Sequence, residues 1–165
     1  FMVHIPYPSR DEEREILRRT TGVGEVELAK VLGASELKEL QEAVRSIPVA
    51  DHVLDYALLL TRGTRVHSSE PQAFLKEWIT WGAGPRASQF LVLGAKAHAA
   101  IQGRSHVAIE DVKAVAHPVL RHRIVTNFSA SAEGMTSDKI IDRLLLEVDP
   151  GAGVGAGVPG IRTAG

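Results

Sequence analysis

The chain has 165 residues, of which 44% are hydrophobic, so it can form one globular domain with a real hydrophobic core. Its formal net charge of −1 argues against a general nucleic-acid or membrane-surface binder, because such proteins usually gather an excess of lysine and arginine on one face. It contains no cysteine and no apolar run of roughly 20 residues, which excludes disulfides, thiolate metal sites and a membrane-spanning helix, and we expect a cytoplasmic protein.

The first eight residues have the pattern of a β-strand that ends at a turn. Hydrophobic residues alternate with others from Phe1 to Ile5, and Pro6 and Pro8 then prevent further strand pairing. A single strand is not stable without partners. We therefore expect residues 1–8 to be the end of a core strand and a hinge, in a chain that begins inside a larger protein.

Four helices are expected between residues 9 and 79, each from a capping residue followed by hydrophobic residues at helical spacing. They are a helix opened by the capping-box spacing of Ser9 and Glu12 and ending near Gly22, one from Ser35 to Pro48, one from Asp51 to Gly63, and a short one from Pro71 to Ile79. The third of these is expected to be buried.

Three more helices are expected in the second half of the chain. They run from Pro85 to Gln102, from Glu110 to a kink or break at Pro118, and from a cap at Thr136 or Ser137 to Asp149. With five to seven helices and no internal sheet, residues 9–149 are expected to form an all-α helical bundle. Residues 150–165 are rich in glycine and alanine and almost uncharged, which predicts a flexible tail.

The stretch at residues 81–88 is suited to approach an anion. Gly82 and Gly84 remove Cβ bulk where a backbone could come close to a ligand, and Pro85 suits the first helical position. Arg86 then lies in the first turn, where unpaired N–H groups and a partial positive charge favour an anion by roughly 0.3–1 kcal/mol. Its planar guanidinium matches phosphate. The alternative is an ordinary helix start with a solvated arginine.

Other signatures of catalysis are missing from the sequence. It has no Gly-x-x-x-x-Gly-Lys-Ser/Thr loop and therefore no phosphate cradle of its own. It also has no Gly-x-Ser-x-Gly elbow. None of the seven histidines has the spacing of a metal ligand, so no metal site is expected, and His98 and His117 are interpreted as helix-face or packing residues.

A second basic cluster consists of Arg121, His122 and Arg123. One interpretation is a solvated helix end, where cations interact favourably with the helix dipole. The other is an interface that meets acidic groups on a neighbouring domain or subunit.

The order and spacing of several short motifs resemble the C-terminal lid portion of MoxR-type AAA+ ATPases from Phe1 to about Asp149. The matching segments are Tyr7-Pro8-Ser9 with Glu12-Glu13 and Ile16-Leu17, Thr61-Arg62, residues 81–88, Lys96-Ala97, Gly103-Arg104, residues 110–112 and residues 118–123. In that family the Gly-Pro-Arg segment is the sensor 2 motif. The resemblance therefore assigns nucleotide binding to Gly84, Pro85 and Arg86, and a catalytic role to Arg86.

The resemblance implies that Arg86 reaches the β- and γ-phosphates of ATP, bound with Mg²⁺ in the preceding core domain of the intact protein. An arginine there stabilises the transferring phosphoryl group and couples nucleotide state to the lid angle. Relatives assemble as rings, typically hexamers, act as chaperone-like remodellers and often serve partners with von Willebrand factor A domains. The ATP-binding motifs of the family would precede Phe1, so this chain alone is expected neither to bind nor to hydrolyse ATP.

One detail limits the resemblance, and two other interpretations of the chain remain. Ala108 stands where the family often has a Thr or Ser helix cap, so that cap must be absent or supplied by another group. A different interpretation of the chain is a free-standing helical adaptor that binds a protein through the surface of Arg121 and Arg123. A helix-turn-helix DNA binder fits poorly, because the connection from Gly103 to Ala108 is too long and the net charge has the wrong sign.

Overall fold

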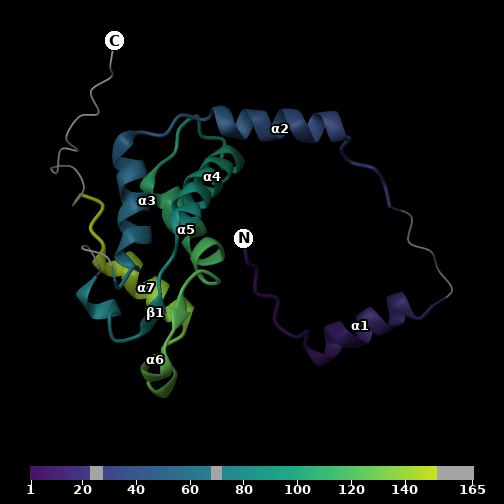
Figure 1. Ribbon diagram of the computed structural model, residues 1–165. Helices are drawn as coiled ribbons and strands as arrows, with labels where there is room; N and C mark the ends of the chain where they lie inside the picture. The colour runs from purple at the N-terminus through teal and green to yellow at the C-terminus, as the bar shows by residue number, and fades with distance from the viewer. Residues whose placement is uncertain (23–27, 68–71, 152–165) are drawn as a thin grey trace, which may run out of the picture.

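The computed structural model describes residues 1–22, 28–67 and 72–151. These residues contain seven α-helices and one two-stranded sheet (Figure 1). The helices are α1 (Arg10–Thr20), α2 (Ala34–Ser46), α3 (Asp51–Gly63), α4 (Pro85–Ile101), α5 (Ile109–Leu120), α6 (Phe128–Ala132) and α7 (Ser137–Glu147). A 3₁₀ turn, η1 (Ala73–Leu75), precedes strand β1 (Ile79–Trp81), which pairs with β2 (Val125–Thr126). The predicted helical bundle is confirmed, but the expectation of no internal sheet is wrong.

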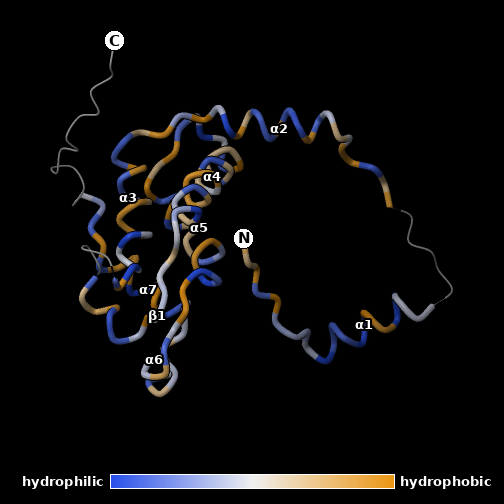
Figure 2. The backbone as a smooth tube through the Cα atoms, viewed as in Figure 1, coloured by the Kyte–Doolittle hydropathy of each residue, from blue (hydrophilic) through white to orange (hydrophobic). Residues whose placement is uncertain are grey.

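The hydrophobic core lies among α3, α4, α5 and α7, with α4 and α5 packed together most extensively. Its largest fully buried side chains are Tyr56, Leu60, Leu75, Leu91, Leu120, Ile140, Ile141 and Leu144. As predicted, α3 is buried. By contrast, α1 contributes no buried residue and stands apart from the other helices (Figure 1), and much of it is hydrophilic (Figure 2).

Local capping chemistry fixes the starts of α1 and α7 as predicted. The Ser9 N–H donates to the Glu12 carboxylate at 2.7 Å, and the Glu12 N–H donates to the Ser9 hydroxyl oxygen at 3.4 Å, which completes the capping box. Thr136 caps α7 by accepting from the backbone N–H of Lys139 at 3.3 Å. These contacts join residues three apart, which is why the sequence alone reveals them.

Two helix starts differ by one or two residues from the prediction. Helix α2 has its N-cap at Gly33 instead of Ser35, because the Glu36 carboxylate accepts a hydrogen bond from the Gly33 N–H at 2.6 Å. The N-cap of α3 is Ala50, so Asp51 lies in the first turn. Its negative charge there interacts favourably with the helix dipole.

The expected helix from Pro71 to Ile79 is wrong over most of its length; Pro71 itself lies outside the described residues. After η1 the chain enters β1, which pairs antiparallel with β2. The backbone N–H of Asn127 donates to the Trp78 carbonyl at 2.9 Å and its side-chain amide donates to the Glu77 carbonyl at 2.8 Å. After η1, hydrogen bonds to β2 and Asn127, about 50 residues away in the sequence, therefore replace the hydrogen bonds of a helix.

Residues 1–5, which are expected to end a strand of a preceding core domain, pair with no strand in the described part of the chain, so that expectation stays a prediction. Instead, the backbone N–H of Met2 donates to the carbonyl of Pro118 at 2.7 Å. Pro118 lies inside α5, which continues to Leu120. The helix is thus not broken at Pro118. Of the predicted tail, residues 150–165, all but the first two residues lie outside the described residues.

Candidate functional site

Arg86 lies in the first turn of α4, as predicted, and its side chain is exposed. Gly84 is the N-cap and Pro85 the first helical residue, and no side chain caps this helix start. Within the ranges that the structure describes, the Arg86 guanidinium makes no hydrogen bond or ion pair. The helix start and the guanidinium are therefore both available to an anion.

The loop before Arg86 is held against the end of α3 by two hydrogen bonds to Ala83, and a third bond anchors Thr64 on the helix. The Ala83 N–H donates to the Thr64 hydroxyl oxygen at 2.8 Å, and the Thr64 hydroxyl donates to the Thr61 carbonyl at 2.7 Å. On the other side of the loop, Nε of Arg65 donates to the Ala83 carbonyl at 2.9 Å. Thr64 and Ala83 are fully buried, so these bonds fix the position from which α4 begins.

The two glycines of this loop have different roles. A Cβ on Gly82 would lie 2.1 Å from the Thr64 carbonyl oxygen and 2.8 Å from the Arg65 nitrogen, so Gly82 is needed for contact with the chain's own backbone. The expectation that Gly82 clears space for a ligand is therefore wrong. A Cβ on Gly84 would have no atom within 4 Å, which leaves the approach to the start of α4 open.

A largely apolar groove of about 770 Å³ runs between α3 and α4, starting two residues after Arg86. Leu54 and Leu58 line it from α3, and Phe90 and Leu93 line it from α4. The Ser88 hydroxyl at its edge is buried and has no hydrogen-bond partner among the described residues. The surface beside Arg86 thus has the character of one that another protein segment covers.

A buried carboxylate joins the far end of α4 to the start of α5. The fully buried Asp111 accepts hydrogen bonds from both terminal nitrogens of Arg104, from Nδ1 of His98 at 2.6 Å and from the Ala108 N–H at 2.8 Å. The Arg104 guanidinium holds the pKa of Asp111 well below its ordinary value; burial opposes this shift, and the bonds from Ala108 and His98 add to it. Asp111 therefore satisfies the N–H of Ala108, which has no capping side chain.

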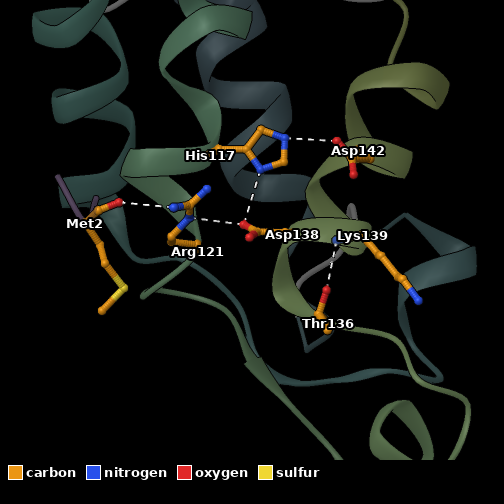
Figure 3. Close-up of polar contacts among 7 residues, drawn as sticks. All are labelled: Met2, His117, Arg121, Thr136, Asp138, Lys139 and Asp142. Atoms are coloured by element: carbon orange, nitrogen blue, oxygen red, sulfur yellow. Dashed lines mark hydrogen bonds and ion pairs between the residues drawn. The ribbon is translucent and has the colours of Figure 1, made fainter. Parts of the chain in front are cut away.

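The members of the basic cluster contact different parts of the structure. Nε of Arg121 donates to Asp138 of α7 at 3.1 Å and its Nη1 lies 3.5 Å from the Met2 carbonyl (Figure 3). Arg123 donates to the Val119 carbonyl and stacks on Phe90, with 5.3 Å from its guanidinium carbon to the ring centroid. Because Arg121 and Arg123 are engaged within the chain, an adaptor that binds through them is not favoured.

His122 and His117, which lie in or near the basic cluster, have different surroundings. Burial and the nearby Arg123 charge lower the pKa of His122. His117 links α5 to α7, with Nδ1 at 3.2 Å from Asp138 and Nε2 at 2.9 Å from Asp142 (Figure 3). His98 and His117, which the sequence analysis interprets as helix-face or packing residues, thus each contact an aspartate on another helix. Their spacing in the sequence did not reveal these contacts.

The described residues contain neither a cluster of metal-binding side chains nor a helix that could span a membrane. No group of three or more histidine, cysteine, aspartate or glutamate side chains in those ranges is arranged to hold a metal ion. Among the same residues, every helix is too short or too polar to cross a bilayer.

Comparison with known proteins gives concordant matches. Residues 74–144 match the family described as the AAA lid domain. Over 148 residues the chain is 34% identical to the chaperone MoxR1 of Mycobacterium tuberculosis, a match that covers 90% of this chain and 39% of that protein. It is 26% identical over 149 residues to the uncharacterized protein YeaC of Bacillus subtilis, covering 90% of this chain and 44% of the relative.

A solved structure has the same fold. The crystal structure of a putative ATPase from Cytophaga hutchinsonii superposes with a TM-score of 0.77 at 28% identity, over 89% of this chain and 45% of that one. The chain thus spans about two fifths of the length of the proteins it matches. The lid-domain match includes α4, which carries Arg86, together with α5 and most of α7. Together these similarities support a C-terminal lid fragment of a MoxR-type AAA+ ATPase.

Proposed function

We propose that this lid region senses ATP bound to a AAA+ core domain of the intact protein, and that Arg86 is the residue that contacts the phosphates. The observation that carries the proposal is the exposed Arg86 guanidinium at an uncapped helix start. In this position the helix dipole and the guanidinium act on the same anion. Gly84 and Pro85 complete the phosphate-facing surface.

The hydrogen-bonded loop before Arg86 would transmit a contact between Arg86 and the phosphates to other parts of the lid. Because Thr64 and Arg65 hold Ala83, a force on Arg86 is carried to α3 as well as to α4. Contacts to the γ-phosphate and its Mg²⁺ exist only in the ATP state, so they bias the lid toward one orientation and are lost on hydrolysis. The groove between α3 and α4 offers the core domain an apolar surface to cover.

We infer further that the intact protein hydrolyses ATP and acts as a chaperone-like remodeller, since one relative is named a chaperone and a structural neighbour a putative ATPase. We also propose that the intact protein assembles as a homo-oligomeric ring, specifically a hexamer. Its proposed partner is a protein that carries a von Willebrand factor A domain. ATP hydrolysis would require the core domain, and the lid region alone is not expected to bind ATP.

The test is the Arg86→Ala substitution in the intact protein. We expect ATP turnover to fall at least tenfold, since loss of an arginine at the transferring phosphoryl group costs roughly a thousandfold in other systems. Arg86→Lys keeps the charge but not the planar fork and should recover only part of the activity. The matched control is Arg10→Ala, because Arg10 is also exposed at a helix start. Unchanged turnover in Arg86→Ala would refute the role of Arg86.

A further inference from the structure

The groove between α3 and α4 is basic as well as apolar. The residues that line it include two cations, Arg45 and Lys96, and no aspartate or glutamate. Nζ of Lys96 donates to the Arg45 carbonyl at 2.7 Å. Arg45 itself is exposed, and its guanidinium makes no hydrogen bond or ion pair with another described residue. The groove therefore offers an apolar surface with a cation at its rim that can still take up a carboxylate.

Helix α1 has an uncovered surface of the complementary kind. Glu13, Ile16 and Leu17 have the i, i+3 and i+4 spacing that places side chains on one face of a helix. Ile16 is 49% exposed and Leu17 is 55% exposed. Within the described ranges, the Glu13 carboxylate makes no hydrogen bond or ion pair. We call Glu13, Ile16 and Leu17 the α1 face.

The other three carboxylates of α1 have partners within or next to the helix. Asp11 and Glu15 form ion pairs with arginines three or four residues further along, and Glu12 completes the capping box with Ser9. Glu13 is therefore the carboxylate of α1 that remains for an outside partner, and it lies beside the two exposed apolar side chains.

The α1 face and the groove do not meet within one chain. Helix α1 contributes no buried residue and stands apart from α3 and α4 (Figure 1). Helix α2 ends beside the groove, where Arg45 lies, and extends away from it toward the segment that leads to α1 (Figure 1). Two different surfaces of one chain can instead meet between copies in a head-to-tail contact, which forms a ring when the rotation between copies closes.

We propose that the α1 face of one copy docks into the groove between α3 and α4 of a neighbouring copy. In this contact Ile16 and Leu17 pack on the leucines of α3, and Glu13 pairs with Arg45. The contact removes apolar surface from water and joins two opposite charges that have no other partner among the described residues. The inference rests on the proposed ring and names the segment that covers the groove.

The experiment measures self-association of the intact protein with ATP by analytical ultracentrifugation. Truncation of a central apolar side chain in an interface lowers affinity about tenfold. Leu17→Ala and Leu58→Ala should therefore each weaken association about tenfold. Both leucines are about half exposed in the single chain, so both variants should fold. The matched control is Leu146→Ala, because Leu146 is 85% exposed on α7, outside both surfaces, and its loss should change nothing.

Charge exchange tests whether Glu13 meets Arg45 and whether the contact joins two copies. Glu13→Arg and Arg45→Glu should each weaken association, since each variant places two like charges opposite one another. A mixture of the two single variants should recover association, because each α1 face then meets a groove of opposite charge on the other variant. A contact within one chain would not recover on mixing.

Three results would overturn the inference. Unchanged association in Leu17→Ala and Glu13→Arg would leave the ring standing and assign the groove to another surface, such as the core domain. Failure of the mixture to recover would exclude a contact between copies through this pair. If the parent protein is a monomer with ATP, the proposed ring fails as well, whereas ATP turnover of Arg86→Ala tests the proposed sensor role separately.

Discussion

The hydroxyl of Thr64 accepts a hydrogen bond from the backbone N–H of Ala83 at 2.8 Å, across 19 residues of sequence. The same hydroxyl donates to the Thr61 carbonyl, so one side chain completes the end of α3 and fixes the loop that leads into α4. The position of Arg86 therefore depends on a residue outside the motif that contains it.

Replacing Thr64 should destabilise the fold. Thr64→Val keeps the shape but leaves the buried Ala83 N–H without a partner, which costs about 1–3 kcal/mol. Urea denaturation should show a lower midpoint with an unchanged slope. Thr20→Ala is the control, because the Thr20 hydroxyl bonds the Ile16 carbonyl at 2.8 Å on an exposed helix. A Thr64→Val protein as stable as the parent would contradict the importance of this bond.

The two glycines of the loop should respond differently to alanine. Gly82→Ala places a Cβ against the backbone of Thr64, which must shift, at a cost of about 1–3 kcal/mol or more. Gly84→Ala meets open space and should cost less than about 1 kcal/mol, through the weaker N-cap preference of alanine. Thermal unfolding of the two variants side by side measures the difference. Equal destabilisation would show that the Thr64 contact does not constrain Gly82.

Asp111 should make stability depend on acid pH. Because its pKa is lowered in the folded protein, its ionised form stabilises the fold above the ordinary value of 3.8, and this contribution is lost as the pH falls toward the folded-state pKa. Unfolding free energy should therefore decrease with falling pH below about 4. Asp111→Asn should remove this contribution and cost about 1–3 kcal/mol at neutral pH, since the neutral amide cannot accept all the hydrogen bonds that the buried carboxylate accepts from Arg104, His98 and Ala108.

The control for this prediction is Asp11→Asn, because the Asp11 side chain is 88% exposed on α1. It should alter neither the midpoint nor its dependence on acid pH appreciably. An identical dependence of unfolding free energy on pH in the parent and Asp111→Asn proteins would contradict the stabilising role of ionised Asp111.

The contact between Arg121 and Asp138 should be measurable as a coupling between α5 and α7. A double-mutant cycle with Arg121→Ala and Asp138→Asn is expected to give about 0.5–1 kcal/mol, because the Arg121 side chain is only 19% exposed. The exposed pair of Arg19 and Glu15, 2.8 Å apart on α1, should give about 0.3–0.5 kcal/mol. A coupling for Arg121 and Asp138 no larger than that of the surface pair would mean that it does not help join the helices.

The features that the sequence predicted correctly depend on neighbouring residues. The capping box of Ser9 and Glu12, the Thr136 cap and the proline at the start of α4 act over three residues or fewer, so the residue types alone identify them. The placement of Arg86 at a helix start followed from such local signals. Its contact with ATP stays a prediction.

The features that were missed depend on distant residues. The segment after η1 becomes a strand because it meets Val125 and Thr126. Gly82 is required by Thr64, and Asp111 is buried because Arg104 and His98 reach it from the end of α4. Periodicity and spacing contain no information on which segments meet in space, so none of these three contacts could have been derived from them.

The length of α4 places the proposed phosphate site at one end of a lever. Its 17 residues form a rod about 25 Å long, with Arg86 at one end and the ion-pair cluster of Asp111 beside the other. Each degree of tilt moves the far end by about 0.4 Å for a rod of that length. If Arg86 contacts the phosphates as proposed, a rotation of several degrees about that contact would displace the start of α5 by ångströms, although it lies about the length of α4 away from the nucleotide.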